Sequence, residues 1–160
     1  MKRIIYCLAM CAVTMIAGGY FTAFGTDTWY HSLLMPPGTP ADSIFPIAWS
    51  IIYLLIAAAF AIAFAKCKDA NQCGKINSLF INQLFLHILW CFCFFYTGYI
   101  MLALLVILLL DIIVFRTIYA FYGLPAGVAA VILLPYCGWI LFATYLNAAF
   151  VWLNGFVISF

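Results

Sequence analysis

Charged residues are scarce in this chain, and their scarcity decides which class of protein it is. Only 6% of the 160 residues are charged, whereas 70% are hydrophobic. A soluble domain carries about 25% charged residues, so the composition excludes a soluble globular fold. Lipid must therefore surround most of the molecular surface.

The sequence also lacks the residue patterns on which common enzyme classes depend. It contains no glycine-rich phosphate-binding loop, no pair of carboxylates, and no Ser or Cys nucleophile with a matching His and Asp. Nothing therefore supports a hydrolase or a kinase. The net charge of +2 is too small and too dispersed for a protein that binds nucleic acid.

Metal-binding cysteine patterns are missing too, although the chain has seven cysteines. Five of them lie within apolar runs, where a thiol behaves as a small hydrophobe: Cys7, Cys11, Cys91, Cys93 and Cys137. Cys67 and Cys73 lie in a polar loop, but their spacing does not match a zinc site and no histidine is near. We expect no metal site in the protein.

Long apolar runs predict an all-α integral membrane protein with five transmembrane helices in a single bundle. A span needs about 20 apolar residues, and the runs cover residues 4–24, 44–65, 76–95, 100–121 and 126–152. Pro135, within the fifth run, is expected to kink that helix because it removes a backbone hydrogen bond. The whole chain, residues 1–160, is expected to form one membrane domain.

Lysine and arginine predict the orientation of this bundle. Five spans place all of these residues at one end: Lys2, Arg3, Lys66, Lys68, Lys75 and Arg116. The loop 25–43, at the opposite end, contains none. Because positive charge marks the cytoplasmic side, we expect a cytoplasmic N-terminus in a bacterial cell membrane.

Aromatic and polar residues form a stripe on three of the expected helices. Residues three or four positions apart share one helix face, and the stripes are Trp49, Tyr53, Ile56 and Phe60; His87, Trp90, Cys91 and Phe94; and Trp139, Phe142, Ala143, Leu146, Asn147 and Phe150. Together they can line one cavity. Simple packing between helices is the alternative explanation, and spacing alone does not decide between the two.

Two polar residues within the spans have roles that can be weighed from the sequence. His87 either serves as an axial haem ligand, with Cys91 one turn away, or hydrogen-bonds to a backbone carbonyl or to Asn147, which is commoner for a buried histidine. Asp111 and Arg116 lie about 140° apart around one helix, so we expect no direct pair between them.

These residues and their order resemble the tryptophan-rich sensory protein/translocator protein family, also known as the peripheral-type benzodiazepine receptor family. The segment LLPYCGWILFATYLN, residues 133–147, is similar to the fifth-helix pattern of Pro-Tyr, Trp, Phe-Ala-Thr and Leu-Asn. Three earlier segments are also similar, in the same order: Trp29-Tyr30 with the prolines that follow; Trp49 with Tyr53; and Asn82-Gln83 with Trp90 and Phe94-Phe95.

The resemblance implies a ligand pocket closed by a lid. Family members bind porphyrins, haem and related tetrapyrroles between their helices, beneath the first loop. The pocket residues that it implies are Trp49, Tyr53, Trp90, Phe94, Trp139, Ala143, Leu146 and Asn147. From the stripes we add His87 and Phe142 to the expected pocket. The loop 25–43, with Trp29, Tyr30, Pro36 and Pro40, is the implied lid. A homodimer with no obligatory cofactor is implied as well.

We therefore expect a membrane receptor or carrier for tetrapyrroles, acting in transport or in stress signalling. One alternative is a porphyrin-modifying enzyme that uses the same pocket. A second is a structural or partner-binding membrane subunit without a saturable ligand. Small residues that could support self-association by close helix packing are Ala57, Ala58, Ala59, Ala61, Ala63, Gly127, Ala129 and Ala130.

Overall fold

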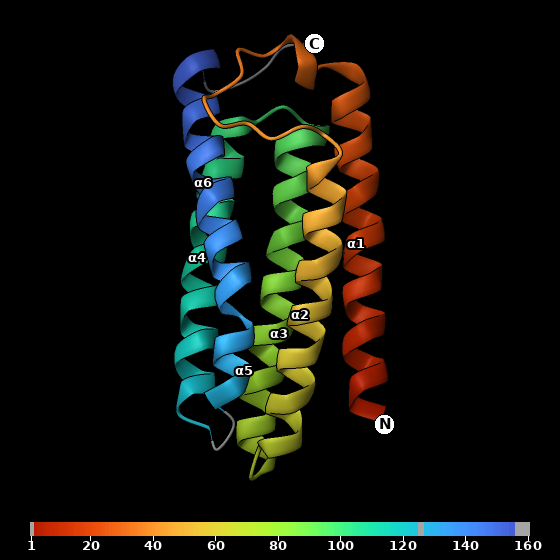
Figure 1. The fold of residues 1–160 in the computed structure, drawn as a ribbon, viewed down its shortest axis with the longest axis vertical. Coiled ribbons are helices and arrows are strands. Elements are labelled where there is room, and N and C mark those ends of the chain that lie inside the picture. The colour runs from red at the N-terminus through yellow and green to blue at the C-terminus, as the bar shows by residue number, and fades with distance from the viewer. Residues whose placement is uncertain (1, 125–126, 156–160) are drawn as a thin grey trace.

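The apolar runs of the sequence become the long helices of the structure. The computed structural model describes residues 2–124 and 127–155, and in these ranges five helical spans are long and apolar enough to cross a membrane (Figure 1). They are Lys2–Thr28, Ile44–Lys66, Ala70–Tyr96, Ile100–Tyr122 and Gly127–Asn154. The expected all-α fold with five transmembrane helices is confirmed.

Two of the five spans are not a single regular α-helix. The helices are α1 (Lys2–Thr28), α2 (Ile44–Lys66), α3 (Ala70–Cys91), α4 (Ile100–Tyr122), α5 (Gly127–Ile132) and α6 (Leu134–Asn154). The third span consists of α3 and one turn of π-helix, η2 (Phe92–Tyr96), and the fifth consists of α5 and α6. A short 3-10 turn, η1 (Tyr30–Ser32), begins the loop after α1.

The start of α3 is the largest difference from the expected helix bounds. It begins at Ala70 rather than at residue 76, because the Asp69 carboxylate accepts a hydrogen bond of 2.8 Å from the Gln72 backbone N–H. Such an N-cap satisfies a backbone donor that the first turn of a helix leaves unpaired. The polar residues after Asp69 therefore belong to the helix and not to the loop.

Pro135 explains the interruption of the fifth span. It lies in the first turn of α6, directly after the break at Leu133, where its missing N–H has no partner to lose. The expected kink is thus present as a boundary between two helices. The Leu133 N–H donates to the Ala130 carbonyl of α5 at 3.2 Å, which holds the start of α6 close to the end of α5.

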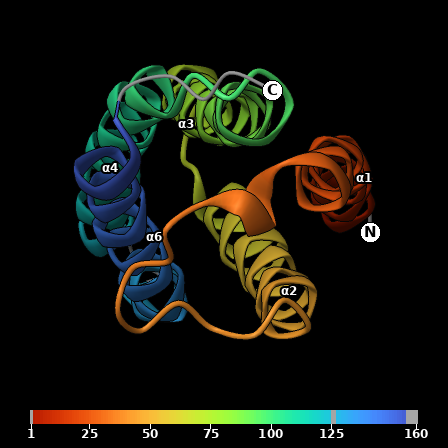
Figure 2. The same ribbon diagram turned by 90° about the horizontal axis from the view of Figure 1, so that it is seen from above.

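The view along the bundle shows how the helices surround its interior (Figure 2). α1 packs against α2, α3 and η2, while α4 packs against α3, α5 and α6. The loop between α1 and α2 crosses the end of the bundle from α1 toward α6 and then returns to α2. It therefore covers the space between these helices.

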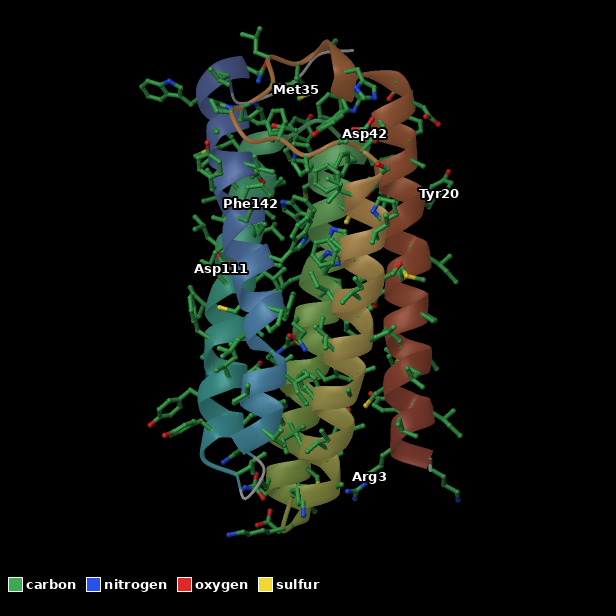
Figure 3. The ribbon with its side chains drawn as sticks, viewed as in Figure 1. Arg3, Tyr20, Met35, Asp42, Asp111 and Phe142 are labelled. Carbon is green, nitrogen blue, oxygen red and sulfur yellow. A yellow bond between two sulfur atoms is a disulfide. The ribbon has the colours of Figure 1, made fainter. Side chains whose placement is uncertain are left out.

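The two ends of the bundle differ in charge. Figure 3 shows Arg3 at the end where α2 joins α3, and Met35 and Asp42 in the loop at the opposite end. The direction of each span places all six lysines and arginines at, or within two turns of, the Arg3 end. We call it the basic end.

The small residues proposed for self-association are used largely within one chain. α2 packs against α5, and Ala57, Ala59, Ala129 and Ala130 are all buried inside the bundle. Close packing of these alanines therefore stabilises the monomer fold. Ala58, Ala61 and Gly127 are partly exposed, and a homodimer stays a prediction.

A disulfide bond joins Cys67, directly after α2, to Cys73 near the start of α3. This pairing was not predicted from the sequence. The remaining five cysteines are free thiols, four of them buried.

The closest backbone approach of α1 generates a prediction about stability. A Cβ atom on Gly25 would lie 2.9 Å from the Cα of Phe95 in η2, so Gly25→Ala must push the two elements apart. We expect a loss of about 1–3 kcal/mol in unfolding free energy, measured by denaturant unfolding in detergent. Gly74→Ala is the matched control, because its Cβ would meet no atom within 4 Å. An equal loss in both variants would contradict the prediction.

Candidate functional site

A cavity of about 500 Å³ lies between α1, α2, α3 and α6, beneath the loop that follows α1. It extends from Tyr30 and Asp42 in that loop down to Met15 on α1. Met15 and Asp27, the two ends of the α1 wall, are separated by about 18 Å at the helical rise of 1.5 Å per residue. The cavity is therefore elongated along α1, and all of its lining residues except Tyr30 and Asp42 belong to the membrane-spanning helices.

Seven of the residues expected in the site do line this cavity. They come from all three predicted stripes and from the loop: Tyr30, Trp49, Tyr53, His87, Trp90, Trp139 and Ala143. Trp49 is at the centre of the group, since its ring lies 4.1 Å from the His87 ring and 6.3 Å from the Trp139 ring, measured between centroids. The Trp49 and Trp139 planes are almost perpendicular, at 89°.

The other four helical candidates lie behind the cavity wall. Phe94, Leu146 and Asn147 are buried in the core, and Phe142 packs against Trp139 with ring centroids 5.7 Å apart. Figure 3 shows Phe142 and Asp111 on the α6 and α4 side of the bundle. These residues support the lining residues, and direct contact with a ligand stays a prediction for them.

One wall of the cavity was missed by the sequence reasoning. α1 contributes Met15, Gly18, Gly19, Thr22, Ala23, Thr26 and Asp27. Their spacing of three and four residues indicates a single helix face, but most of these side chains are small, and no aromatic residue marks this face in the sequence. Small side chains are what this wall needs, because they leave room beside the aromatic residues of α2 and α3.

His87 is held by a partner that the sequence did not suggest. Its Nδ1 shares a hydrogen bond with the Tyr53 hydroxyl, so the expected bond to Asn147 or to a backbone carbonyl is not formed. His87 Nε2 is buried and has no hydrogen-bond partner among the described residues. The Tyr53 bond and the Trp49 contact fix the imidazole in the wall of the cavity.

Asn147 instead joins three helices behind the cavity. Its Oδ1 accepts a hydrogen bond of 3.0 Å from Trp90 Nε1, and its Nδ2 donates one of 2.9 Å to the Ile100 carbonyl in the first turn of α4. Asn147 is only 1% exposed. Without its side chain, Trp90 Nε1 and the Ile100 carbonyl would be left without a hydrogen-bond partner in a nonpolar environment. The orientation of the Trp90 ring depends on this bond.

The loop is held to the bundle at several points. Trp29 Nε1 donates to the Phe95 carbonyl at 2.9 Å, and Tyr145 donates to the Pro37 carbonyl at 3.0 Å. The Asn154 side chain bonds both the N–H and the C=O of Leu34, at 2.8 and 3.1 Å. The loop thus lies over this end of the cavity, with Pro36 buried and Pro40 partly buried, and its role as a lid stays a prediction.

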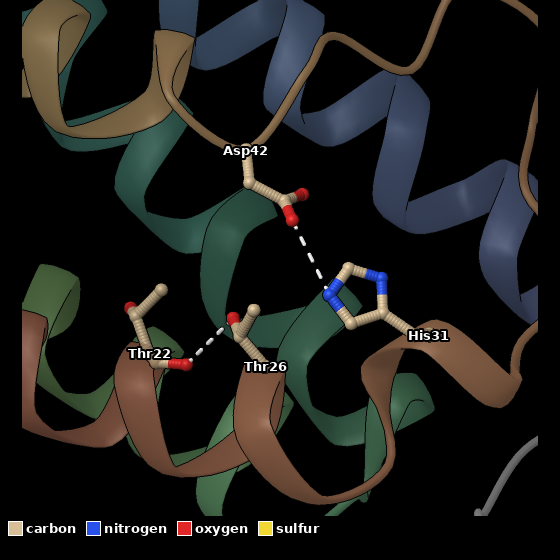
Figure 4. Close-up of polar contacts among 4 residues, drawn as sticks. All are labelled: Thr22, Thr26, His31 and Asp42. Carbon is tan, nitrogen blue, oxygen red and sulfur yellow. Dashed lines mark hydrogen bonds and ion pairs between the residues drawn. The ribbon is translucent and has the colours of Figure 1, made fainter.

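The loop end of the cavity is acidic. Asp27 and Asp42 line it, and His31 lies 3.2 Å from Asp42 (Figure 4). Figure 4 also shows the Thr26 hydroxyl bonded to the Thr22 carbonyl of its own helix. Burial, together with the nearby Asp42 carboxylate, raises the pKa of the Tyr30 phenol to about 12, so this group is a neutral hydrogen-bond donor at pH 7.

Asp111 lies outside the cavity. Its Oδ2 accepts a hydrogen bond of 2.9 Å from the Thr144 hydroxyl on α6. The carboxyl group therefore connects α4 to α6 and does not face the site.

The Asn147 contacts generate a prediction. Asn147→Leu leaves the Trp90 N–H and the Ile100 carbonyl without partners, and we expect a loss of about 1–3 kcal/mol in unfolding free energy, with a changed Trp90 fluorescence. Denaturant unfolding and emission spectra in detergent measure both effects. Asn82→Leu is the control, because Asn82 is exposed and bonds only to Ser78 on the same helix face. An unchanged stability of Asn147→Leu would show that the bonds contribute nothing.

Comparisons with known proteins agree with this architecture. The TspO/MBR family model matches residues 7–153. The tryptophan-rich protein TspO of Archaeoglobus fulgidus is 36% identical over 154 residues, which cover 96% of this chain and 97% of that protein. TspO of Chlorobaculum tepidum is 31% identical over 92% of this chain and 93% of its own length, and the tryptophan-rich sensory protein of Cereibacter sphaeroides is 31% identical over 88% and 84%. The chain therefore belongs to the TspO/MBR family of multi-pass integral membrane proteins.

Proposed function

We propose that the protein binds a planar, lipophilic ligand of the tetrapyrrole class in the cavity and serves as a membrane receptor or carrier for it. The observation that carries the proposal is the cavity of about 500 Å³ lined by Trp49, Trp90 and Trp139. Small-molecule sites of roughly 300–1,000 Å³ with apolar and aromatic walls and a few polar groups are typical. A flat macrocycle suits such walls because aromatic rings pack favourably face to edge and in offset stacks.

The few polar groups of the site can orient such a ligand. Trp139 Nε1 is buried without a hydrogen-bond partner among the described residues, and the Tyr30 phenol lines the loop end. A small shift of either side chain would let it donate to a ring nitrogen or a carbonyl of the ligand. Polar groups placed in this way give orientation, while the aromatic walls supply most of the contact area.

Packing of the ring, rather than iron coordination, is the binding mode that we propose. His87 Nε2 is buried and the Trp49 ring lies against the imidazole, so the histidine offers no open coordination position. Haem and iron-free porphyrin should therefore bind with similar affinity. A role of His87 as a haem ligand would instead require the Trp49 contact to open.

The loop suits the role of a lid in either transport or sensing. Entry of a ligand from the loop end requires release of the Tyr145 and Asn154 contacts, which are hydrogen bonds at an exposed edge. Lids of this kind open on the microsecond to millisecond timescale. The relative from Cereibacter sphaeroides is named a sensory protein, and a sensory role for this chain is one form of the proposal.

The proposal includes an orientation of the bundle in the membrane. The basic end faces the cytoplasm of a bacterial cell, in accordance with the positive-inside rule.

A cavity-filling substitution tests the proposal directly. Gly19 lines the cavity and a Cβ there would meet no atom within 4 Å, so Gly19→Phe can fill the space without displacing the backbone. We expect a loss of protoporphyrin IX affinity of at least tenfold, measured by tryptophan quenching in nanodiscs. Gly138→Phe is the matched control, since Gly138 is exposed on α6, is equally uncrowded and lies outside the cavity lining.

Three outcomes of this titration separate the candidate functions. Saturable binding that Gly19→Phe abolishes and Gly138→Phe preserves supports a receptor or carrier. The same binding accompanied by a time-dependent change in the porphyrin spectrum would support an enzyme on this cavity. No saturable binding by a folded sample would overturn the proposal and favour a structural or partner-binding subunit.

The acidic loop end generates a second prediction. Porphyrin carboxylates are repelled by the Asp27 carboxylate, so Asp27→Asn should strengthen protoporphyrin IX binding roughly twofold to fivefold at low salt, with a smaller effect at high salt. The uncharged dimethyl ester of the same porphyrin is the control, and its affinity should not change. Equal effects on the acid and the ester would rule out this electrostatic explanation.

A further inference from the structure

The disulfide between Cys67 and Cys73 lies at the basic end of the bundle, far from the loop that closes the cavity. It joins the residue after α2 to the first turns of α3. Both cysteines are partly exposed, so small reactants can reach them. The bond belongs to no part of the proposed ligand site.

A disulfide bond and most of the positive residues lie at the same end of the bundle, which is an unusual combination. The positive residues of this end mark the cytoplasmic side of a membrane, where glutathione and thioredoxin keep thiols reduced. In mesophilic organisms, disulfides in that compartment are rare and are usually transient bonds of catalytic or redox-sensing sites. A permanent structural bond would instead be expected on the opposite side of the membrane.

A groove beside the disulfide is suited to an anionic reactant. It is lined by Lys2, Arg3, Tyr6, Phe64, Cys73, Gly74 and Asn77. The Tyr6 hydroxyl donates a 2.9 Å hydrogen bond to Asn77 Oδ1, which joins α1 to α3 across the groove. Arg3 Nη1 lies 3.8 Å from Cys67 Sγ. The positive side chains of Lys2 and Arg3 therefore line the same groove as Cys73.

We propose that Cys67 and Cys73 form a reversible redox site that exchanges with an anionic low-molecular-weight thiol of the glutathione class. The thiolate of one such molecule, bound in the groove, attacks Cys73 Sγ and forms a mixed disulfide. The bond to Cys67 breaks and its electron pair stays on Cys67 Sγ, where the Arg3 guanidinium stabilises the new thiolate. A second thiolate then attacks the mixed disulfide and releases Cys73 as a thiolate and the small molecules as their disulfide.

The two steps balance, because two small thiols are oxidised to one disulfide while the protein disulfide is reduced to two thiols. Oxidation of the protein is the reverse reaction and uses the small disulfide as oxidant. Exchange is faster when the leaving thiol has a lower pKa, which assigns Arg3 the role of activating Cys67. The inference uses the proposed orientation of the bundle and does not depend on the proposed ligand.

The test measures the exchange in the full-length protein in nanodiscs. Samples are equilibrated with mixtures of reduced and oxidised glutathione, trapped with a maleimide and analysed by mass. We expect the Cys67–Cys73 pair to convert reversibly within the range of cytosolic glutathione ratios. A pair that stays oxidised in excess reduced glutathione would overturn the proposal and identify a structural bond.

Two charge variants locate the reactive site. Arg3→Gln should slow reduction by glutathione roughly threefold to tenfold, since it weakens both the attraction of the anion and the leaving thiolate. Arg116→Gln removes the same charge at the same end but outside this groove, and its rate should equal that of the unmodified protein. Equal rates for all three proteins would rule out the role of Arg3.

Orientation is tested separately in intact bacterial cells. A membrane-impermeant maleimide should leave the reduced pair unlabelled until the cells are opened, and the added oxidant diamide should protect the pair from later labelling. Labelling of the pair in intact cells would place the basic end outside, and this inference would then fail while the proposed ligand binding stayed open to its own test.

Discussion

A membrane has no water to bind the polar groups of a protein, so every polar side chain inside the bundle needs a partner within the chain. Bonds between helices meet this demand for several of these groups: Tyr53 to His87, Trp90 to Asn147, and Thr144 to Asp111. Among the described residues, His87 Nε2 and Trp139 Nε1 are buried without a partner. Each bond joins two different helices, and Asn147 also reaches a third. These bonds orient the aromatic rings around the cavity, since hydrophobic contacts alone have little directional preference in lipid.

The cavity exists because the helices that surround it contribute side chains of different sizes. α2, α3 and α6 contribute large rings, whereas α1 presents small residues such as Gly18, Gly19 and Ala23. At the loop end, Gly25 lets α1 come into backbone contact with η2. One helix is thus held close at one end while its small side chains leave the interior open. The loop then crosses from α1 to α6 and covers that opening.

The two ends of the molecule differ in their chemical groups. The loop end combines an aromatic cavity with the carboxylates Asp27 and Asp42. The basic end combines lysine and arginine with the Cys67–Cys73 disulfide. A bundle of about 20-residue spans keeps these ends about 30 Å apart, so the proposed ligand binding and the proposed thiol exchange would take place on opposite sides of one membrane.

The number of spans, most of their bounds and the side that carries the positive charge could all be predicted from the sequence, because each depends on local hydropathy and charge. The stripes that contain Trp49, His87 and Trp139 could also be predicted, because helical spacing alone places the members of each stripe on one face of their own helix. The sequence did not reveal the partner of His87, the α1 wall or the Cys67–Cys73 bond. Each of these requires knowing which helix faces which and how closely they approach. That information resides in the packing of residues far apart in the chain, and only the tertiary structure decided it.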